Sequence, residues 1–288
     1  HVENGFQKYD EKEDNGSNPK LKGWRNEKRQ PLSPLGYRDG FSNPTSLKYL
    51  FDKVLVKEEW TKEKNYGTYL AFRKTEVREN VFDDRIKKAI EDIKDQYKKE
   101  KAKLPKDAAL KEYAEALFMG RFKNGTPPAL SSKPLDEEKW RVNGGDLPFD
   151  YENDITGLVC PLGAHVRSMN PEGTELNTVG IVRRCMLYEQ ESEGLETRSG
   201  LLFVSYQNSL TKGFEVLFDR MKIPNNVDPI LYRPEPSDYT PFFNTFRAAV
   251  VPKSTRQIDL TAGGAELTVF RGGEYFFMPS VQYLNSLR

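Results

Sequence analysis

The feature that most constrains this fold is a run of apolar side chains that recur every three or four residues from Val81 to Tyr97. The intervening positions carry lysine and glutamate of interleaved sign, which is typical of a solvated face rather than a binding patch. The segment therefore predicts an amphipathic helix that is ended by Pro105 and covers a core with Val81, Phe82, Ile86, Ala89, Ile90, Ile93 and Tyr97.

Shorter helix and strand signals surround this segment. The β-branched and aromatic residues of Thr68–Phe72 predict a strand, and the continuous apolar run Gly200–Tyr206 predicts a buried one. A helix with Asn208 as its candidate cap is predicted after the second strand by Leu210, Phe214, Leu217, Phe218 and Met221. Another helix, ended by the turn at 124–128, is predicted by Leu110, Tyr113, Ala114, Leu117 and Phe118.

The overall order of these signals indicates the fold class. Glu266–Phe270 and Glu274–Phe277, separated by Arg271-Gly-Gly273, predict a terminal hairpin. Helices and strands alternate without a regular βαβ rhythm, so we expect an α+β fold with an antiparallel sheet. Residues 129–157 form a long loop that we expect to cover a site or an interface. The polar residues 1–35 predict an irregular arm, which leaves residues 36–288 as the folded domain.

Composition narrows the function classes. Lysine and arginine number 44 against 43 acidic residues, and the net charge of +1 provides no strong field for nucleic acid or an anionic membrane. No apolar run approaches the roughly 18 residues that a membrane span needs. Cys160 and Cys185 are too few for a disulfide framework, although one bridge stays open. The compartment is undetermined, and the glycosylation sequons at Asn15 and Asn124 slightly favour secretion.

Histidine is scarce in this chain. His1 lies at the chain end, so His165 is the one histidine placed to ligate a metal or activate a nucleophile. A lone histidine is more often structural, and a zinc site would need several carboxylates or both cysteines around it. Haem needs only one axial imidazole, which His165 alone could supply.

Two further positions could carry chemistry. Asp39 lies between Gly36 and Gly40, where it either caps a β-turn or points into a pocket that the glycines leave open to a bulky ligand. Arg183, next to Arg184, is either half of an ordinary dibasic pair or a guanidinium that stabilises developing negative charge.

Five segments resemble, in the same order along the chain, the signatures of dye-decolourising (DyP-type) haem peroxidases. They are Gly36-Tyr-Arg-Asp-Gly-Phe-Ser-Asn-Pro44, Cys160-Pro-Leu-Gly-Ala-His-Val-Arg-Ser-Met-Asn-Pro171, Ile181-Val-Arg-Arg184, Gly200-Leu-Leu-Phe-Val-Ser-Tyr-Gln207 and Gly272-Gly-Glu-Tyr-Phe-Phe-Met-Pro-Ser280. Five ordered matches are far more specific than any single one. The resemblance extends from Gly36 to the carboxyl end of the chain.

The resemblance implies a ferredoxin-like α+β fold of the dimeric α+β barrel type, with iron protoporphyrin IX (haem b) as cofactor. In the family pattern, His165 matches the proximal ligand of the iron. Asp39 matches the distal aspartate, and Arg183 matches the distal arginine. Residues 36–288 are thus expected to be a haem-binding peroxidase domain.

Other residues of the implied site are assigned by the same resemblance. Leu201 and Phe203 match the apolar residues that line the peroxide side of the haem. A carboxylate usually orients the proximal histidine and raises its basicity, and Asp228 is the candidate for it, with Asp259 as the fallback.

The chain also departs from the family pattern. Cys185-Met-Leu-Tyr188 stands where Gly-Ile-Pro-Tyr-Gly is common, and Glu172 stands where a basic residue is frequent, which bears on pocket shape and on contacts to the haem carboxylates. Family members normally have a whole amino-terminal half before the first motif, and only 35 residues precede it here. We expect that half to have been removed, to belong to another chain, or to be replaced over the exposed surface by a partner or a second copy.

Three functions are weighed. The first is a haem peroxidase that reduces hydrogen peroxide and oxidises dyes, phenols and other small organic reductants by one-electron steps, with Asp39 moving the peroxide proton and Arg183 stabilising the departing oxygen. The second is a haem-binding carrier or assembly protein with the same fold and little turnover, suggested by the departures near Cys185. The third is a structural fragment without haem. Neither nucleic acid nor a membrane span is expected.

Overall fold

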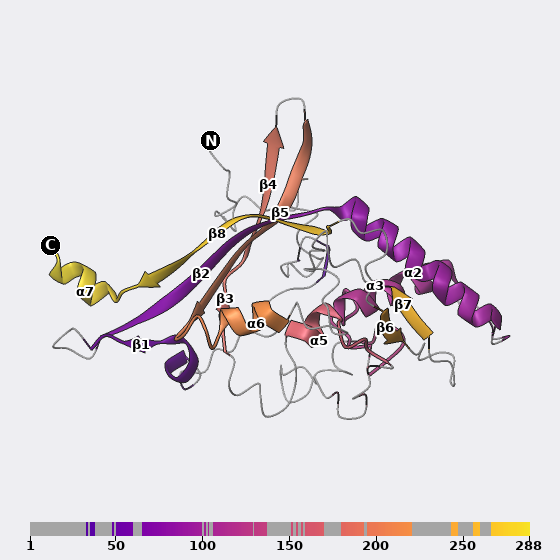
Figure 1. Ribbon diagram of the computed structural model, residues 1–288, viewed down its shortest axis with the longest axis horizontal. Coiled ribbons are helices and arrows are strands. Elements are labelled where there is room, and N and C mark those ends of the chain that lie inside the picture. Colours follow the sequence, from indigo (N-terminus) through magenta and orange to yellow (C-terminus); the bar gives the residue numbers. More distant parts are fainter. Residues whose placement is uncertain are drawn as a thin grey trace.

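The computed structural model describes residues 33, 35–37, 48, 50–59, 65–99, 101, 103, 106–128, 130–136, 151, 154, 157, 159–169, 180–192, 195–220, 243–246, 256–259 and 266–288. Within these ranges the chain forms a six-stranded sheet, a separate two-stranded ribbon and a set of helices. The short helices α5 (His165–Met169) and α6 (Phe214–Arg220) lie beside each other on one side of the sheet (Figure 1).

Two long strands form the centre of the sheet, β2 (Tyr66–Val77) and β5 (Leu195–Gln207). β2 also pairs with β8 (Thr268–Met278), and β5 also pairs with β4 (Met186–Ser192) and β3 (Val182–Arg183). All these pairs are antiparallel. With helices between β2 and β4 and between β5 and β8, the order β8-β2-β5-β4 is that of a ferredoxin-like βαββαβ unit. The expected α+β class is confirmed.

The largest cluster of buried apolar side chains lies around the two long helices. The predicted amphipathic helix is α2 (Glu79–Lys99), and it packs against α3 (Asp107–Met119), the second predicted helix. Phe82 and Phe118 meet edge to face across the pair, with ring centres 6.0 Å apart. The cluster includes Phe82, Ile86, Ala89, Ile93, Tyr97, Leu110, Tyr113, Leu117, Phe118, Phe122 and Leu267.

The registers of the central strands assign side chains to the two faces of the sheet. Ser205 on β5 lies opposite both Arg183 on β3 and Ala71 on β2, and Ala71 lies opposite Tyr275 on β8. Side chains two residues apart along a strand point to the same face. Every second residue before and after these positions therefore lies on the same face as Ser205. The resulting surface, called here the site face, consists of Tyr69, Ala71, Arg73, Thr75, Arg183, Leu201, Phe203, Ser205, Gln207 and Tyr275.

The predicted terminal hairpin is wrong. Residues 268–278 form one continuous strand along β2, with a register shift opposite Lys74 and Thr75 that leaves Arg271 as the extra residue. Gly272 follows it with a φ of 146°, a conformation that favours glycine. The glycines that resembled a turn therefore form a β-bulge, which bends the strand without reversing it.

The region after β5 also differs from the prediction. Helix α6 begins only at Phe214, and Asn208 does not cap it, because its side-chain amide donates a hydrogen bond to the Asp52 carbonyl at 2.7 Å. This bond joins the end of β5 to the π-helix η1 (Leu50–Val54). The apolar residues 201–204 of β5 are half-buried rather than fully buried.

The remaining described elements are peripheral. They are β1 (Val56–Lys57), the ribbon of β6 (Phe243–Phe246) and β7 (Arg256–Asp259), and α7 (Val281–Ser286).

No helix in the described part of the chain has the length and apolar character needed to cross a membrane. The predicted arm lies outside the described residues except for Ser33 and Leu35, as does most of the loop at 129–157.

Replacing Ile93 in α2 with alanine should lower the free energy of unfolding by about 2–5 kcal/mol, because its side chain is 0% exposed within the helix cluster. Urea unfolding followed by far-UV circular dichroism measures the change. The matched control is Ile90→Ala in the same helix, where the isoleucine is only partly buried and the loss should be smaller. Equal losses would contradict the assigned packing.

Candidate functional site

His165 is held by the segment on which it lies. It begins α5 directly after the turn Cys160–Ala164, in which the Ala164 N–H donates to the Pro161 carbonyl at 3.0 Å. Gly120, the left-handed cap of α3, approaches so closely that an added Cβ would lie 3.4 Å from Cβ of Ala164. The end of α3 therefore helps to set the position of this turn, and the His165 side chain itself is half-buried.

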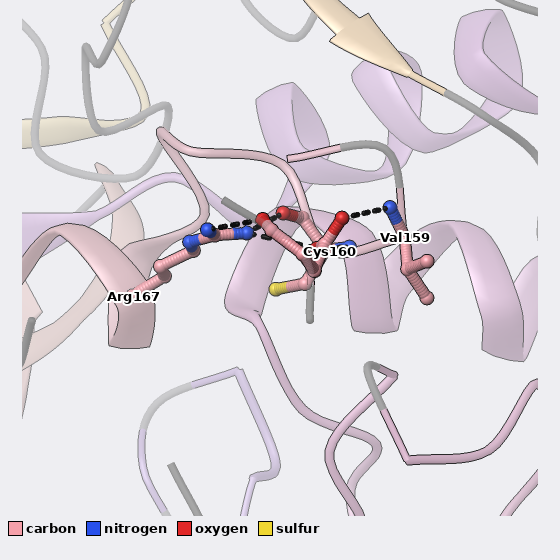
Figure 2. A network of polar contacts seen from close by, with 4 residues as sticks. Val159, Cys160 and Arg167 are labelled. Atoms are coloured by element: carbon pink, nitrogen blue, oxygen red, sulfur yellow. Dashed lines mark hydrogen bonds and ion pairs between the residues drawn. The ribbon is translucent and has the colours of Figure 1, made fainter. Parts of the chain in front are cut away.

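A buried ion pair braces the same turn (Figure 2). The Arg167 guanidinium donates to the Asp154 carboxylate at 2.9 Å, to the Asp154 carbonyl at 2.6 Å and to the Cys160 carbonyl at 2.5 Å. The same carboxylate accepts the N–H groups of Val159 at 3.0 Å and Cys160 at 2.8 Å. The Tyr151 ring lies 4.3 Å from the guanidinium carbon. Arg167 thus ties α5 to the loop that precedes His165.

Cys160 lies inside this network. Its side chain is fully buried, and burial raises the pKa of its thiol to about 12, with the Asp154 carboxylate adding to the effect and Arg167 opposing it. Both cysteines are free thiols, so the bridge left open by the sequence is not formed. At neutral pH the Cys160 sulfur is therefore protonated and serves as a packing group.

The first motif is anchored to the C-terminal half of α3. Tyr37 is buried, and its hydroxyl donates to the Glu115 carbonyl at 2.8 Å. Burial, followed by the negative charge of Glu115, raises the pKa of Tyr37 well above its usual value. Gly36 has a φ of 79°, which closes the turn before Tyr37. Helix α3 therefore positions both the start of the Gly36–Gly40 motif and the turn that carries His165.

The site face brings three other predicted residues together. Arg183 lies opposite Ser205, and Phe203 and Leu201 follow on the same face at two-residue spacing. All three predicted side chains are half-buried. The neighbouring positions on this face are polar, and the Ser205 hydroxyl donates a hydrogen bond to the Gln207 side-chain oxygen at 2.9 Å.

Helix α6 connects this face with the helix that begins at His165. The Phe214 ring of α6 packs on the Phe203 ring, with centres 5.7 Å apart. Helix α6 is also in contact with α5. The structure thus gathers the His165 segment and the Arg183 face around α6.

Other predicted residues are not placed. Asp39 and Asp228 lie outside the described residues. Asp259, the fallback for Asp228, is described only as the last backbone position of β7, paired with Phe243. These three assignments therefore stay predictions.

The described residues fit haem better than a protein-only metal centre. Within the described ranges, no group of three or more His, Cys, Asp or Glu side chains could hold a metal ion. A porphyrin already supplies four nitrogen ligands to its iron and needs one axial imidazole, together with apolar walls. His165, the half-buried Leu201 and Phe203, and the Arg183 guanidinium are side chains of the kinds that such a group would need.

Sequence reasoning missed the positioning residues Asp154, Tyr37 and Gly120. A signal existed for two of the contacts, because Tyr37 and Arg167 both stand inside recognised motifs. Asp154 lies thirteen residues before Arg167 in the predicted loop, and nothing in its sequence context indicates burial.

The described residues form an antiparallel α+β domain that carries one histidine on α5 and an apolar, arginine-bearing sheet face, a set of groups that suits a porphyrin. Comparison with known families identifies the family to which the chain belongs. The family described as "Dyp-type peroxidase, C-terminal" matches residues 30–232. This chain belongs to that family, and the resemblance noted in the sequence is confirmed.

Individual relatives agree with this assignment. The multifunctional dye peroxidase DyP2 of Amycolatopsis sp. is 27% identical over 259 residues, which cover 77% of this chain and 49% of the relative. The solved structure of DyP2 superposes with a TM-score of 0.69 at 21% identity, over 92% of this chain and 63% of that one. The DyP-type peroxidase of Anabaena sp. gives 0.67 at 23% identity, over 92% and 59%. The chain spans about half the length of the curated relatives it matches.

Asp154→Asn should lower the free energy of unfolding by about 3–5 kcal/mol, because it leaves the buried Arg167 guanidinium without a countercharge. Thermal or urea unfolding measures the loss. The control is Asp84→Asn, which removes an exposed pair with Lys87 and should change stability little. If both variants unfold like the unmodified chain, the ion pair does not hold the turn.

Proposed function

We propose that this chain forms the haem-binding part of a peroxidase that uses haem b, reduces hydrogen peroxide and oxidises dyes, phenols and other small organic reductants by one-electron steps. The observation that carries the proposal is the gathering of the His165 helix, α6 and the site face with Arg183. The family and its relatives, which are named as dye peroxidases, support it.

Each residue then has a defined task. His165 would hold the iron through its imidazole, while the Arg167–Asp154 ion pair and Gly120 keep the turn before His165 in place. Leu201 and Phe203 would provide apolar walls for the bound haem and exclude water from it. Asp228, or Asp259 in its place, would accept the second imidazole N–H and orient the ring. Haem, when bound, supplies the two-electron reduction of peroxide.

The proton and the charge of peroxide are handled by two side chains. Asp39 would accept a proton from one peroxide oxygen and return it to the departing oxygen. Arg183 donates hydrogen bonds to that departing oxygen as negative charge develops on it. The pairing of Arg183 with Ser205 fixes the side of the sheet from which this guanidinium acts.

The alternative of a haem carrier with little turnover is not favoured, since the relatives include several proteins named as peroxidases. Within residues 185–188, where the sequence differs from the family pattern, regular strand pairing still forms. Met186 and Tyr188 of β4 lie opposite Leu202 and Gly200 of β5. The differences alter side chains next to Arg183 without disrupting the sheet that carries it.

Adding haemin to the full chain should produce a Soret band that is lost or strongly shifted in His165→Ala, because the variant has no axial imidazole. Absorption spectra of both proteins measure this, and a pyridine haemochrome spectrum identifies type b. Tyr66→Phe, on the opposite face of β2, is the matched control and should bind haemin normally. A chain that takes up no haemin would overturn the proposal, and an unchanged band in His165→Ala would place the iron elsewhere.

Arg183→Leu and Asp39→Asn should keep the Soret band and slow its change after peroxide by about a hundredfold or more, since each removes a group that acts as the O–O bond breaks. Stopped-flow absorbance with stoichiometric peroxide gives the rates. Arg184→Leu is the control for Arg183, because Arg184 is exposed and its Nη1 donates to the Arg183 carbonyl at 2.8 Å. Unchanged rates in both site variants would defeat these roles.

A further inference from the structure

Helix α6 joins the site face to the helix of His165 (Figure 1), and its position depends on side-chain contacts. The helix has seven residues, a length at which an isolated helix is not stable in water. Gly213 seats its amino end, since an added Cβ there would lie 3.0 Å from Cβ of Gln207. The Phe214 ring packs on Phe203 directly after it. Both contacts lie at the first turn of α6, so its second turn needs a further contact with the sheet.

Arg73 of β2 supplies that contact. Its guanidinium carbon lies 5.0 Å from the Phe214 ring centre and 4.1 Å from the Phe218 ring centre. The two rings stand one turn apart on α6 and are almost parallel, with centres 6.3 Å apart and planes inclined by 13°. The Phe270 ring of β8 lies 4.9 Å from the same carbon. One arginine therefore links both turns of α6 to two strands of the sheet.

Strand β8 leaves room for this side chain. Gly273 lies opposite Arg73, and an added Cβ there would lie 3.2 Å from Cγ of Arg73. The β-bulge adds one residue to β8, so that Phe270 rather than Arg271 lies opposite Thr75 on the site face. The bulge thus places an aromatic ring beside Arg73, where regular pairing would place a second cation.

The attraction between Arg73 and these rings is not shared with an acidic side chain. Within the part of the chain that the structure describes, the Arg73 guanidinium forms neither an ion pair nor a hydrogen bond. Burial lowers its pKa, which the nearby Tyr275 opposes, and an arginine stays charged at neutral pH. A cation over aromatic faces is attracted to each of them, and more strongly when it has lost part of its water. The guanidinium is therefore the group that draws α6 onto the site face.

We propose that Arg73 is a positioning residue for the axial histidine, because it holds α6 against the sheet and α6 in turn contacts the helix that begins at His165. The inference rests on the proposed function, in which His165 holds the iron. Arg73 touches neither the iron nor peroxide in this role. Since α5 is only five residues long, a displacement of α6 reaches His165 within little more than one helical turn.

Nuclear magnetic resonance of the haem-free chain tests this link. The chain has two histidines, His1 and His165, so the ring signal of His165 is identified by its loss in His165→Ala. Arg73→Met keeps an unbranched side chain but removes the charge, and it should displace or broaden that signal. Arg73→Lys, which keeps a cation, should restore it in large part. An unchanged His165 signal in Arg73→Met overturns the proposal.

The matched control lies on the same strand. Lys74 is the next residue of β2, and its Nζ lies 4.7 Å from the Tyr188 ring centre on the opposite face of the sheet. Lys74→Met therefore removes a cation from an aromatic ring without touching α6, and it should leave the His165 signal in place. A displacement as large as that in Arg73→Met would contradict a specific role for Arg73.

A second variant keeps the test decisive if Arg73→Met does not fold. Phe218→Leu removes the ring nearest to the guanidinium and keeps Arg73. It should displace the His165 signal in the same way, and the double variant should add little to either single change, because both remove one interaction. A signal in Phe218→Leu identical to that of the unmodified chain overturns the proposal.

Haem release gives a further readout and separates this inference from the proposed function. Transfer of haem from the loaded chain to excess apomyoglobin, followed by Soret absorbance, should be about tenfold faster in Arg73→Met and close to normal in Lys74→Met. A His165 signal that responds to Arg73 in a chain that takes up no haemin supports the positioning role and contradicts the proposed function. Haem release that is equal in Arg73→Met and the unmodified chain overturns the inference even when His165 binds the iron.

Discussion

The antiparallel register between β2, β3 and β5 is the constraint on which the site depends. Arg183, Leu201 and Phe203 share one face of the sheet because of this register. If β5 slipped by one residue, all its side chains would move to the other face. The central strands are pressed together at Gly200, where an added Cβ would lie 2.0 Å from the Thr75 carbonyl oxygen. A small residue at this point secures the pairing that the chemistry requires.

Helix α3 is the second support of the site, and it acts through contacts at Glu115 and at its C-terminal cap Gly120. Tyr37 reaches the Glu115 carbonyl near its middle, and Gly120 meets the Ala164 turn at its end. The helix is itself fixed by packing on α2, so the amphipathic pattern of a distant segment determines where the histidine lies. Packing in the helix pair and the geometry of the site are therefore parts of one arrangement.

Strong periodicity made part of this fold predictable. The three-to-four spacing in α2 and the apolar runs in β2 and β5 were sufficient for the elements and the fold class, because burial demands those periods. The glycines at 272 and 273 were misread, because a bulge and a hairpin turn use the same residue type and only the partner strand distinguishes them. His165, Arg183 and Phe203 were assigned through motifs, and their roles stay predictions. Asp154 was not assigned, because its burial arises from tertiary contacts that no local pattern records.

The buried thiol beside the histidine turn has a chemical consequence under the proposed peroxidase function. Thiolates, rather than thiols, are the forms that hydrogen peroxide oxidises to sulfenic acid. Because burial raises the pKa of Cys160 to about 12, its sulfur is neither ionised nor accessible five residues from the proposed iron ligand. The packing that braces the turn thereby also protects it from oxidative damage, and the domain can carry a sulfur atom next to its most oxidising site.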